Sequence, residues 1–185
     1  MNWEQNERDS RVDTLLKNFV QLTTAVQTCI QIKLQVPTLI LIYASLDIMG
    51  YLNMPADKLS NTADDFCKWA DRYFLPNLKD KSCRSIDLYS ARCGLLHTMS
   101  YESNLTRKEK AKHIMYAWGN ADPNVLKRLI TKMKRVDIVL HVEDMNSALV
   151  AGLQAFLKDI YEDKARVALI LRRASKMFTN IKMPK

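Results

Sequence analysis

Glycine and proline are scarce in this sequence, with 4 Gly and 5 Pro among 185 residues. An all-β sandwich, a glycine-rich nucleotide-binding loop or a low-complexity linker would need more of them. Because both residues disrupt helices, their scarcity favours a mainly helical fold. The hydrophobic share of 48% and the charged share of 26% are typical of a globular chain and argue against disorder.

The sequence also lacks clustered metal ligands and long apolar segments. Its 4 cysteines and 3 histidines fit neither a C-x2-C nor an H-x3-H spacing, so we expect no metal and no cofactor. The longest apolar run, residues 37–46, stops at Asp47 and is too short to span a bilayer. Residues 1–9 are polar and acidic, unlike a signal peptide. These features predict a reduced, cytoplasmic protein without membrane contact.

The net charge of +8 is unevenly distributed. Residues 1–100 carry 11 basic and 11 acidic side chains, whereas residues 101–185 carry 17 basic and 9 acidic ones. The excess falls in three groups, which are Arg107, Lys108, Lys110 and Lys112; Lys127, Arg128, Lys132, Lys134 and Arg135; and Arg172, Arg173 and Lys176. Such groups attract a phosphate backbone, and we take the first as the candidate nucleic-acid-binding segment. Ordinary solvated helix faces have the same composition, so both interpretations stay open.

Apolar residues at three- and four-residue steps predict long helices. We expect them over residues 12–34, 38–52, 62–75, 85–97 and 143–177. Pro37 separates the first two, and the almost wholly apolar second helix should lie at the centre of the fold. The third begins at a capping box, Thr62 to Asp65, and ends before Pro76. A break in the last helix is expected near Gly152 or at 161–164.

The segment between residues 105 and 142 has a different pattern, rich in β-forming residues. We expect helical turns over 105–112, paired strands over 113–118 and 136–142, and a helix over 123–134. A continuous helix through 105–118 is the alternative. Tyr116 and Trp118 could stack on bases, but packing against the core is favoured. The predicted fold is one mainly α domain, a helical bundle carrying a small two-stranded β-ribbon insertion.

One short motif carries chemistry. Arg92 and His97 stand five positions apart near the end of the fourth predicted helix. A guanidinium grips phosphate oxygens, and an imidazole can move a proton near neutral pH, so the pair suits phosphodiester cleavage without a metal. On an ideal helix this offset separates the side chains by about 140°. We therefore expect them to converge only if the helix loosens near Gly94 or a second subunit completes the site.

Structural roles compete with this interpretation. Arg92 could pair with Asp47 or Asp87, and His97 could be a core residue or a helix C-cap. Asp47, in the apolar second helix, could orient the Arg–His pair or merely satisfy buried polar groups. Cys93, beside Arg92, could act as a nucleophile with a lowered pKa, but no histidine other than His97 accompanies it.

Arg92 and His97 match the R-x4–6-H signature of the HEPN superfamily (higher eukaryotes and prokaryotes nucleotide-binding domains). The helix ending Arg-Cys-Gly-Leu-Leu-His, the central helix with its embedded Asp47 and the four-helix pattern of residues 12–97 also resemble that superfamily. The resemblance covers roughly the first 100 residues. Residues 105–142 would then be an insertion and 143–177 a closing helix.

The resemblance implies a metal-independent endoribonuclease that acts as a homodimer, with two Arg–His pairs meeting at the subunit interface. It also implies a place in toxin–antitoxin, defence or stress systems, with an antitoxin-type partner. Arg92 would bind the scissile phosphate, His97 would move the proton, and Asp47 would support them. Active members often carry Asn, Asp or His where this chain has Cys93. The alternative is a non-catalytic helical regulatory protein whose basic surface binds nucleic acid or an acidic partner. An open basic cleft at Arg92 and His97 would favour the nuclease, and burial within one subunit the alternative.

Overall fold

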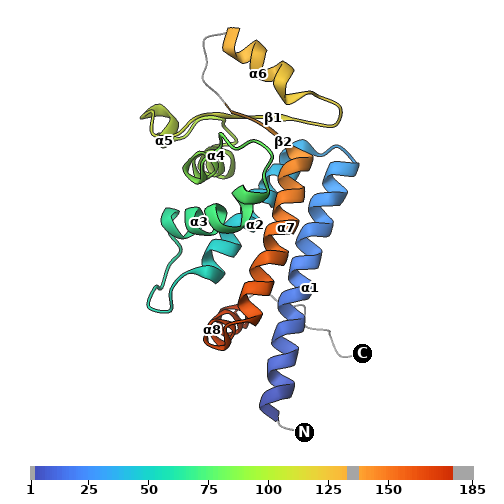
Figure 1. The fold of residues 1–185 in the computed structure, drawn as a ribbon, viewed down its shortest axis with the longest axis vertical. Coiled ribbons are helices and arrows are strands. Elements are labelled where there is room, and N and C mark those ends of the chain that lie inside the picture. Colours follow the sequence, from blue (N-terminus) through green and yellow to red (C-terminus); the bar gives the residue numbers. More distant parts are fainter. Residues whose placement is uncertain (1–2, 133–137, 177–185) are drawn as a thin grey trace.

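The computed structural model describes residues 3–132 and 138–176, with side chains from residue 12 to 129 and from 138 to 176. It confirms the mainly α fold (Figure 1). The three longest helices are α1 (Trp3–Gln31), α2 (Gln35–Asn53) and α7 (Val142–Tyr161). The shorter helical elements are α3 (Ala63–Trp69), η1 (Ala70–Phe74), η2 (Leu75–Asn77), α4 (Ser85–Thr98), α5 (Asn104–Arg107), α6 (Pro123–Lys132) and α8 (Lys164–Ala174). Helix α1 runs alongside α7 and also packs against α2.

Helix α2 lies at the centre, as its composition predicts. It contacts α1, α3, α4, α7 and α8, and Ile42, Tyr43, Leu46 and Met49 are completely buried. By length and hydropathy α2 could cross a membrane, but half of that apolar window is buried inside the protein. Its apolar character is therefore explained by its central position. Pro37 does not separate the helices as expected, because it lies in the first turn of α2, where no intrahelical N–H bond is lost.

The third predicted helix changes its winding before Pro76. The α-helical α3 continues as the π-helical η1 and then as the 3-10 turn η2, which contains Pro76. Helix α7 packs tightly against η1, since a Cβ on Gly152 would lie 2.6 Å from the carbonyl oxygen of Tyr73. Gly152 thus allows a close approach and does not break the helix. The break between α7 and α8 falls within the other predicted range, where Asp163 caps α8.

Two short strands pair as predicted, β1 (Ile114–Ala117) and β2 (Ile138–His141). They run parallel, with Ile114 opposite Ile138, and α6 lies between them in sequence and against them in space (Figure 1). The alternative of a continuous helix through 105–118 is wrong, because α5 is a single turn. Tyr116 packs inward, with its hydroxyl 2.7 Å from that of Tyr43. Of the predicted elements, residues 133–137 and 177 lie outside the described part of the chain.

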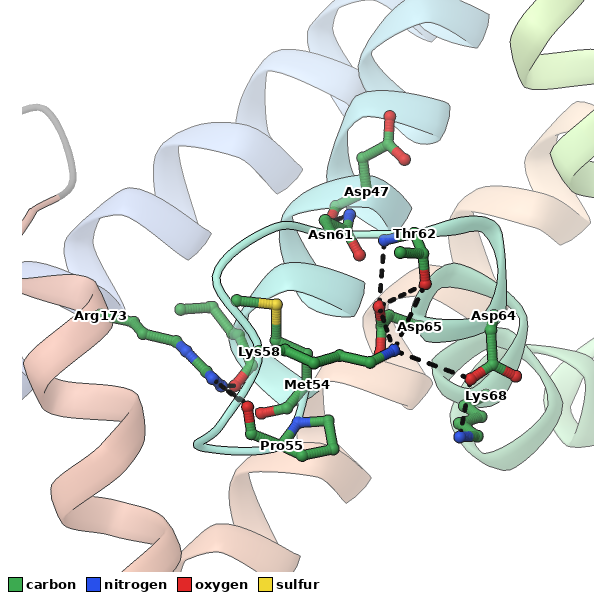
Figure 2. Close-up of polar contacts among 11 residues, drawn as sticks. Asp47, Met54, Pro55, Lys58, Asn61, Thr62, Asp64, Asp65, Lys68 and Arg173 are labelled. Atoms are coloured by element: carbon green, nitrogen blue, oxygen red, sulfur yellow. Dashed lines mark hydrogen bonds and ion pairs between the residues drawn. The ribbon is translucent and has the colours of Figure 1, made fainter.

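Figure 2 shows the polar contacts around the connection between α2 and α3. Asp65 accepts hydrogen bonds from the backbone N–H and the hydroxyl of Thr62, which confirms the capping box, and pairs with Lys58 at 2.9 Å. Arg173, predicted within a surface basic group, is instead 6% exposed. Its guanidinium donates to the carbonyl oxygens of Leu52, Met54 and Pro55 at the end of α2. Arg173 therefore connects α8 to the end of α2 and does not contribute to a basic surface.

Candidate functional site

Asp47, Arg92 and His97 form a continuous line of contacts between α2 and α4. The Nε atom of Arg92 donates to Oδ2 of Asp47 at 2.6 Å, and Nη1 lies 3.2 Å from Nε2 of His97. The side chains of Asp47 and Arg92 are 20% and 22% exposed, whereas His97 is exposed. The predicted carboxylate, guanidinium and imidazole thus meet within one chain.

The five-residue offset between Arg92 and His97 does not keep their side chains apart. Helix α4 is continuous from Ser85 to Thr98, so it does not loosen near Gly94. The long side chain of Arg92 instead reaches His97 while its Nε stays on Asp47. The expectation that convergence needs a loosened helix or a second subunit is therefore wrong.

One of the structural roles predicted for Arg92 is present, whereas neither of those predicted for His97 is. Arg92 does pair with Asp47, whereas Asp87 binds Arg84 and the backbone N–H of Lys112. His97 is neither buried nor the helix cap, since α4 ends at Met99 in a left-handed conformation with φ of 49°.

Burial dominates the electrostatics of Asp47. It raises the pKa of this carboxyl group, and the nearby Arg92 and His97 only partly oppose that shift. For Arg92, burial acts to lower the pKa, but the hydrogen bond and charge of Asp47 outweigh it and raise the pKa above its ordinary value. The guanidinium therefore stays charged and is held on the Asp47 side of the pair.

The contact between Arg92 and His97 has one possible direction as a hydrogen bond. A guanidinium has only donors, so Nε2 of His97 is the acceptor in this contact. Nε2 therefore presents a lone pair beside a permanent positive charge. In this arrangement a group that displaces the Arg92 hydrogen bond can deliver a proton to Nε2.

Gly94 shapes the surroundings of His97. A Cβ at this position would lie 2.6 Å from the carbonyl oxygen of Ser100 and 2.7 Å from that of Glu102. The absence of a side chain lets the segment after α4 fold back across the helix. Ser103 then caps α5 through the backbone N–H groups of Leu105 and Thr106.

The folded-back segment and α4 enclose an open pocket of about 380 Å³. His97, Cys93 and Tyr89 line it from α4, and Asn104 and Arg107 line it from α5. Arg107 is exposed and donates to Oδ1 of Asn104 at 2.7 Å. The structure thus places one member of the predicted basic segment in the same pocket as His97.

The rest of that segment does not join this pocket. Lys108 and Lys110 are exposed but do not line it, and Lys112 is half-buried with its backbone N–H on Asp87. The predicted basic segment is therefore a single arginine at the pocket and a separate exposed pair.

Cys93 lines the pocket and also lies close to Arg92. Its Sγ atom is 3.9 Å from Nη1 of Arg92, and it lines the pocket beside His97. Burial, followed by the neighbouring Cys93, raises the pKa of Tyr89. The Tyr89 ring also packs edge-on against Phe66 at 5.4 Å between centroids. Cys93 and Tyr89 therefore belong, with His97, to the side of the pocket formed by α4. Among the described side chains, no three Asp, Glu, His or Cys residues gather as metal ligands.

Sequence reasoning missed Tyr89, Asn104 and the function of Gly94. Ser103 and Thr106 form a capping box, and that spacing is a signal that could have placed α5. No sequence pattern shows that α5 folds back onto α4. Comparisons with protein-family models, curated proteins and solved structures find no match for this chain.

Proposed function

We propose that this protein is a HEPN-like, metal-independent endoribonuclease. The observation that carries the proposal is the line Asp47–Arg92–His97, which ends at an open pocket also lined by Arg107. A fixed guanidinium, an accessible imidazole and a second arginine that lines the same pocket have the chemistry needed to bind and cleave a phosphodiester.

In the proposed reaction, Arg92 and Arg107 bind the non-bridging oxygens of the scissile phosphate. Nε2 of His97 removes the proton from the ribose 2′-hydroxyl, whose oxygen forms a bond to phosphorus. The bond from phosphorus to the 5′-oxygen breaks, and that oxygen takes up a proton. The products are a 2′,3′-cyclic phosphate and a free 5′-hydroxyl. A homodimer would supply the acid from its second His97, and RNA is the proposed substrate.

The test uses purified protein and a labelled single-stranded RNA in EDTA. We expect cleavage by the wild type, products with cyclic phosphate ends, and a loss of at least 100-fold in Arg92→Ala and in His97→Ala, because a positioned acid or base contributes about 10²–10⁴-fold. Arg72→Ala is the matched control, since Arg72 is a surface arginine paired with Asp159 at 2.7 Å. Equal cleavage by wild type and both site variants would refute the assignment. If sedimentation shows only a monomer, no second His97 is present to act as the acid, and that part of the proposed reaction is excluded.

A non-catalytic regulatory role is the second candidate, favoured by the ion pair of Arg92 with Asp47 inside one chain. In that role the pair ties α4 to α2, and an acidic or antitoxin-type protein would be the partner. RNA that binds without being cut, with equal affinity for wild type and His97→Ala, would support this candidate over the nuclease.

A further inference from the structure

A second and larger cleft, of about 780 Å³, opens at the carboxyl ends of β1 and β2. It shares no lining residue with the pocket at His97. Gly119 and Asn120 line it after β1, and His141 and Glu143 line it at the end of β2. Parallel strands typically place ligand-binding groups at this edge, because the loops that follow them open there. The topology therefore gives this cleft the position of a binding site.

Three lysines line the cleft from two separate parts of the chain. Lys79 and Lys81 come from the connection before α4, and Lys127 comes from α6. The side chain of Lys79 is 81% exposed, and that of Lys127 is 49% exposed with its Nζ atom 3.7 Å from Oδ2 of Asp80. The Nζ atom of Lys81 donates to the carbonyl oxygen of Pro76 at 2.8 Å. Compact ammonium groups of this kind bind phosphate as point charges.

The acidic residues of the cleft are already held by the protein. Asp144 pairs with Lys79 at 2.6 Å, and Asp80 accepts from the backbone N–H and the hydroxyl of Ser82. Burial acts to raise the pKa of Asp80, but the Ser82 hydrogen bonds and Lys127 keep it below its ordinary value. Lys79 is exposed although Asp144 is half-buried, so water screens their attraction and a doubly charged phosphate can compete for Lys79.

His141 and the first turn of α7 complete the lining of the cleft. His141 holds the loop after β1, because its Nε2 lies 2.9 Å from the carbonyl oxygen of Gly119 and its Nδ1 lies 2.9 Å from Oε2 of Glu143. Glu143 in turn accepts from the backbone N–H of Gly119 at 2.9 Å. Helix α7 begins at this edge, and its N-cap residue His141 makes no side-chain capping hydrogen bond.

We propose that this cleft binds a small phosphorylated molecule of sugar-phosphate or mononucleotide size. The phosphate would lie between Lys79 and Lys127 near the start of α7, where the helix dipole also favours an anion. The volume suits such a ligand, since small-molecule pockets typically measure about 300–1,000 Å³. Asn120 and Asn124, which also line the cleft, would bind the hydroxyl groups of the sugar.

The experiment is calorimetric titration of the full chain with ribose 5-phosphate, with ribose and inorganic phosphate as comparison ligands. We expect ribose 5-phosphate to bind more tightly than inorganic phosphate, and ribose not to bind. The double variant Lys79→Ala/Lys127→Ala should bind ribose 5-phosphate at least tenfold more weakly. Lys68→Ala is the matched control, because Lys68 is an exposed lysine paired with Asp64 at 2.7 Å outside the cleft.

Thermal unfolding of each variant shows whether the fold is intact, and Lys81→Glu gives an independent lesion in the same cleft. Equal affinity of wild type, double variant and Lys81→Glu for ribose 5-phosphate would overturn the proposal. So would the absence of ribose 5-phosphate binding together with RNA binding that the double variant loses, since the cleft would then belong to a nucleic-acid surface. Arg92→Ala should bind ribose 5-phosphate normally, so this result is separate from the fate of the nuclease proposal.

Discussion

Replacing Gly94 by alanine sets two effects of opposite sign against each other. Gly94 lies inside α4, where alanine is favoured over glycine by about 1 kcal/mol in helix propensity. However, the new Cβ would meet the carbonyl oxygens of Ser100 and Glu102 at 2.6 and 2.7 Å. Neither oxygen belongs to a flexible side chain, so the backbone after α4 has to move.

The cost of that movement decides the sign. Overpacking a tight site typically costs about 1–3 kcal/mol, and two backbone contacts place Gly94→Ala in the upper part of that range. After subtraction of the propensity gain, we expect a net loss of about 1–2 kcal/mol in the free energy of unfolding. Urea titration followed by circular dichroism measures this difference directly.

The same substitution should affect the pocket. Moving the segment after α4 displaces α5, and with it Arg107, from His97. RNA cleavage should therefore fall even under conditions where Gly94→Ala is fully folded. A variant that is more stable than the wild type by about 1 kcal/mol, as helix propensity alone would give, would refute the close approach across Gly94.

Three further substitutions test the rest of the structure. Arg173→Met leaves carbonyl oxygens at the end of α2 without their donor, so the free energy of unfolding should fall by about 2–4 kcal/mol in urea titration, and an unchanged midpoint would contradict this role. Burial acts to raise the pKa of Asp87, but hydrogen bonds from the Arg84 guanidinium and from backbone N–H groups keep that pKa below its ordinary value. The carboxylate therefore stabilises the fold above about pH 4, and this stabilisation is lost as the pH falls further. Asp87→Asn should therefore flatten the loss of stability between about pH 5 and 3 in urea titrations at several pH values. Finally, Arg92→Met should destabilise by about 1–3 kcal/mol because it strands Asp47, and the double variant Asp47→Leu/Arg92→Met should recover most of that stability without recovering cleavage. A double variant less stable than Arg92→Met would show that the pair is mainly structural.

Most of the helical architecture could be predicted because it follows from local periodicity. Helix α2 is apolar on all sides because five helices contact it, and this composition is visible in the sequence. The pairing of the two β-forming segments could be predicted but not their parallel direction, since the helix between them is long enough for the crossover that parallel strands require without excluding antiparallel pairing. The winding of η1 could not be predicted, and neither could the close approach of α7 to it at Gly152, because both are tertiary features without a local sequence pattern.

The site was only partly predictable for a related reason. Arg92, His97 and Asp47 stand out as polar groups of suitable chemistry, but their distances depend on how α2 and α4 cross. Arg173 looks like a surface residue next to Arg172, and only the end of α2 shows why it is buried. Lys112 was assigned to a basic surface because its side chain is charged, yet the structure uses its backbone N–H. Sequence identifies the chemical groups, and tertiary contacts decide which of them remain available to a ligand.

The energetics of the Asp47–Arg92 pair bear on which function is favoured. Partly buried ion pairs contribute little net stability, because the cost of removing both charges from water offsets their attraction. Burial indeed raises the pKa of Asp47 despite the guanidinium at 2.6 Å, so ionising this carboxylate opposes folding more than it supports it. Apolar side chains at both positions would tie α4 to α2 equally well. What apolar residues could not do is hold a guanidinium 3.2 Å from an accessible imidazole at the edge of an open pocket. The pair is thus better explained by the position it gives to Arg92 than by the stability it adds, and this favours the nuclease over the purely structural role.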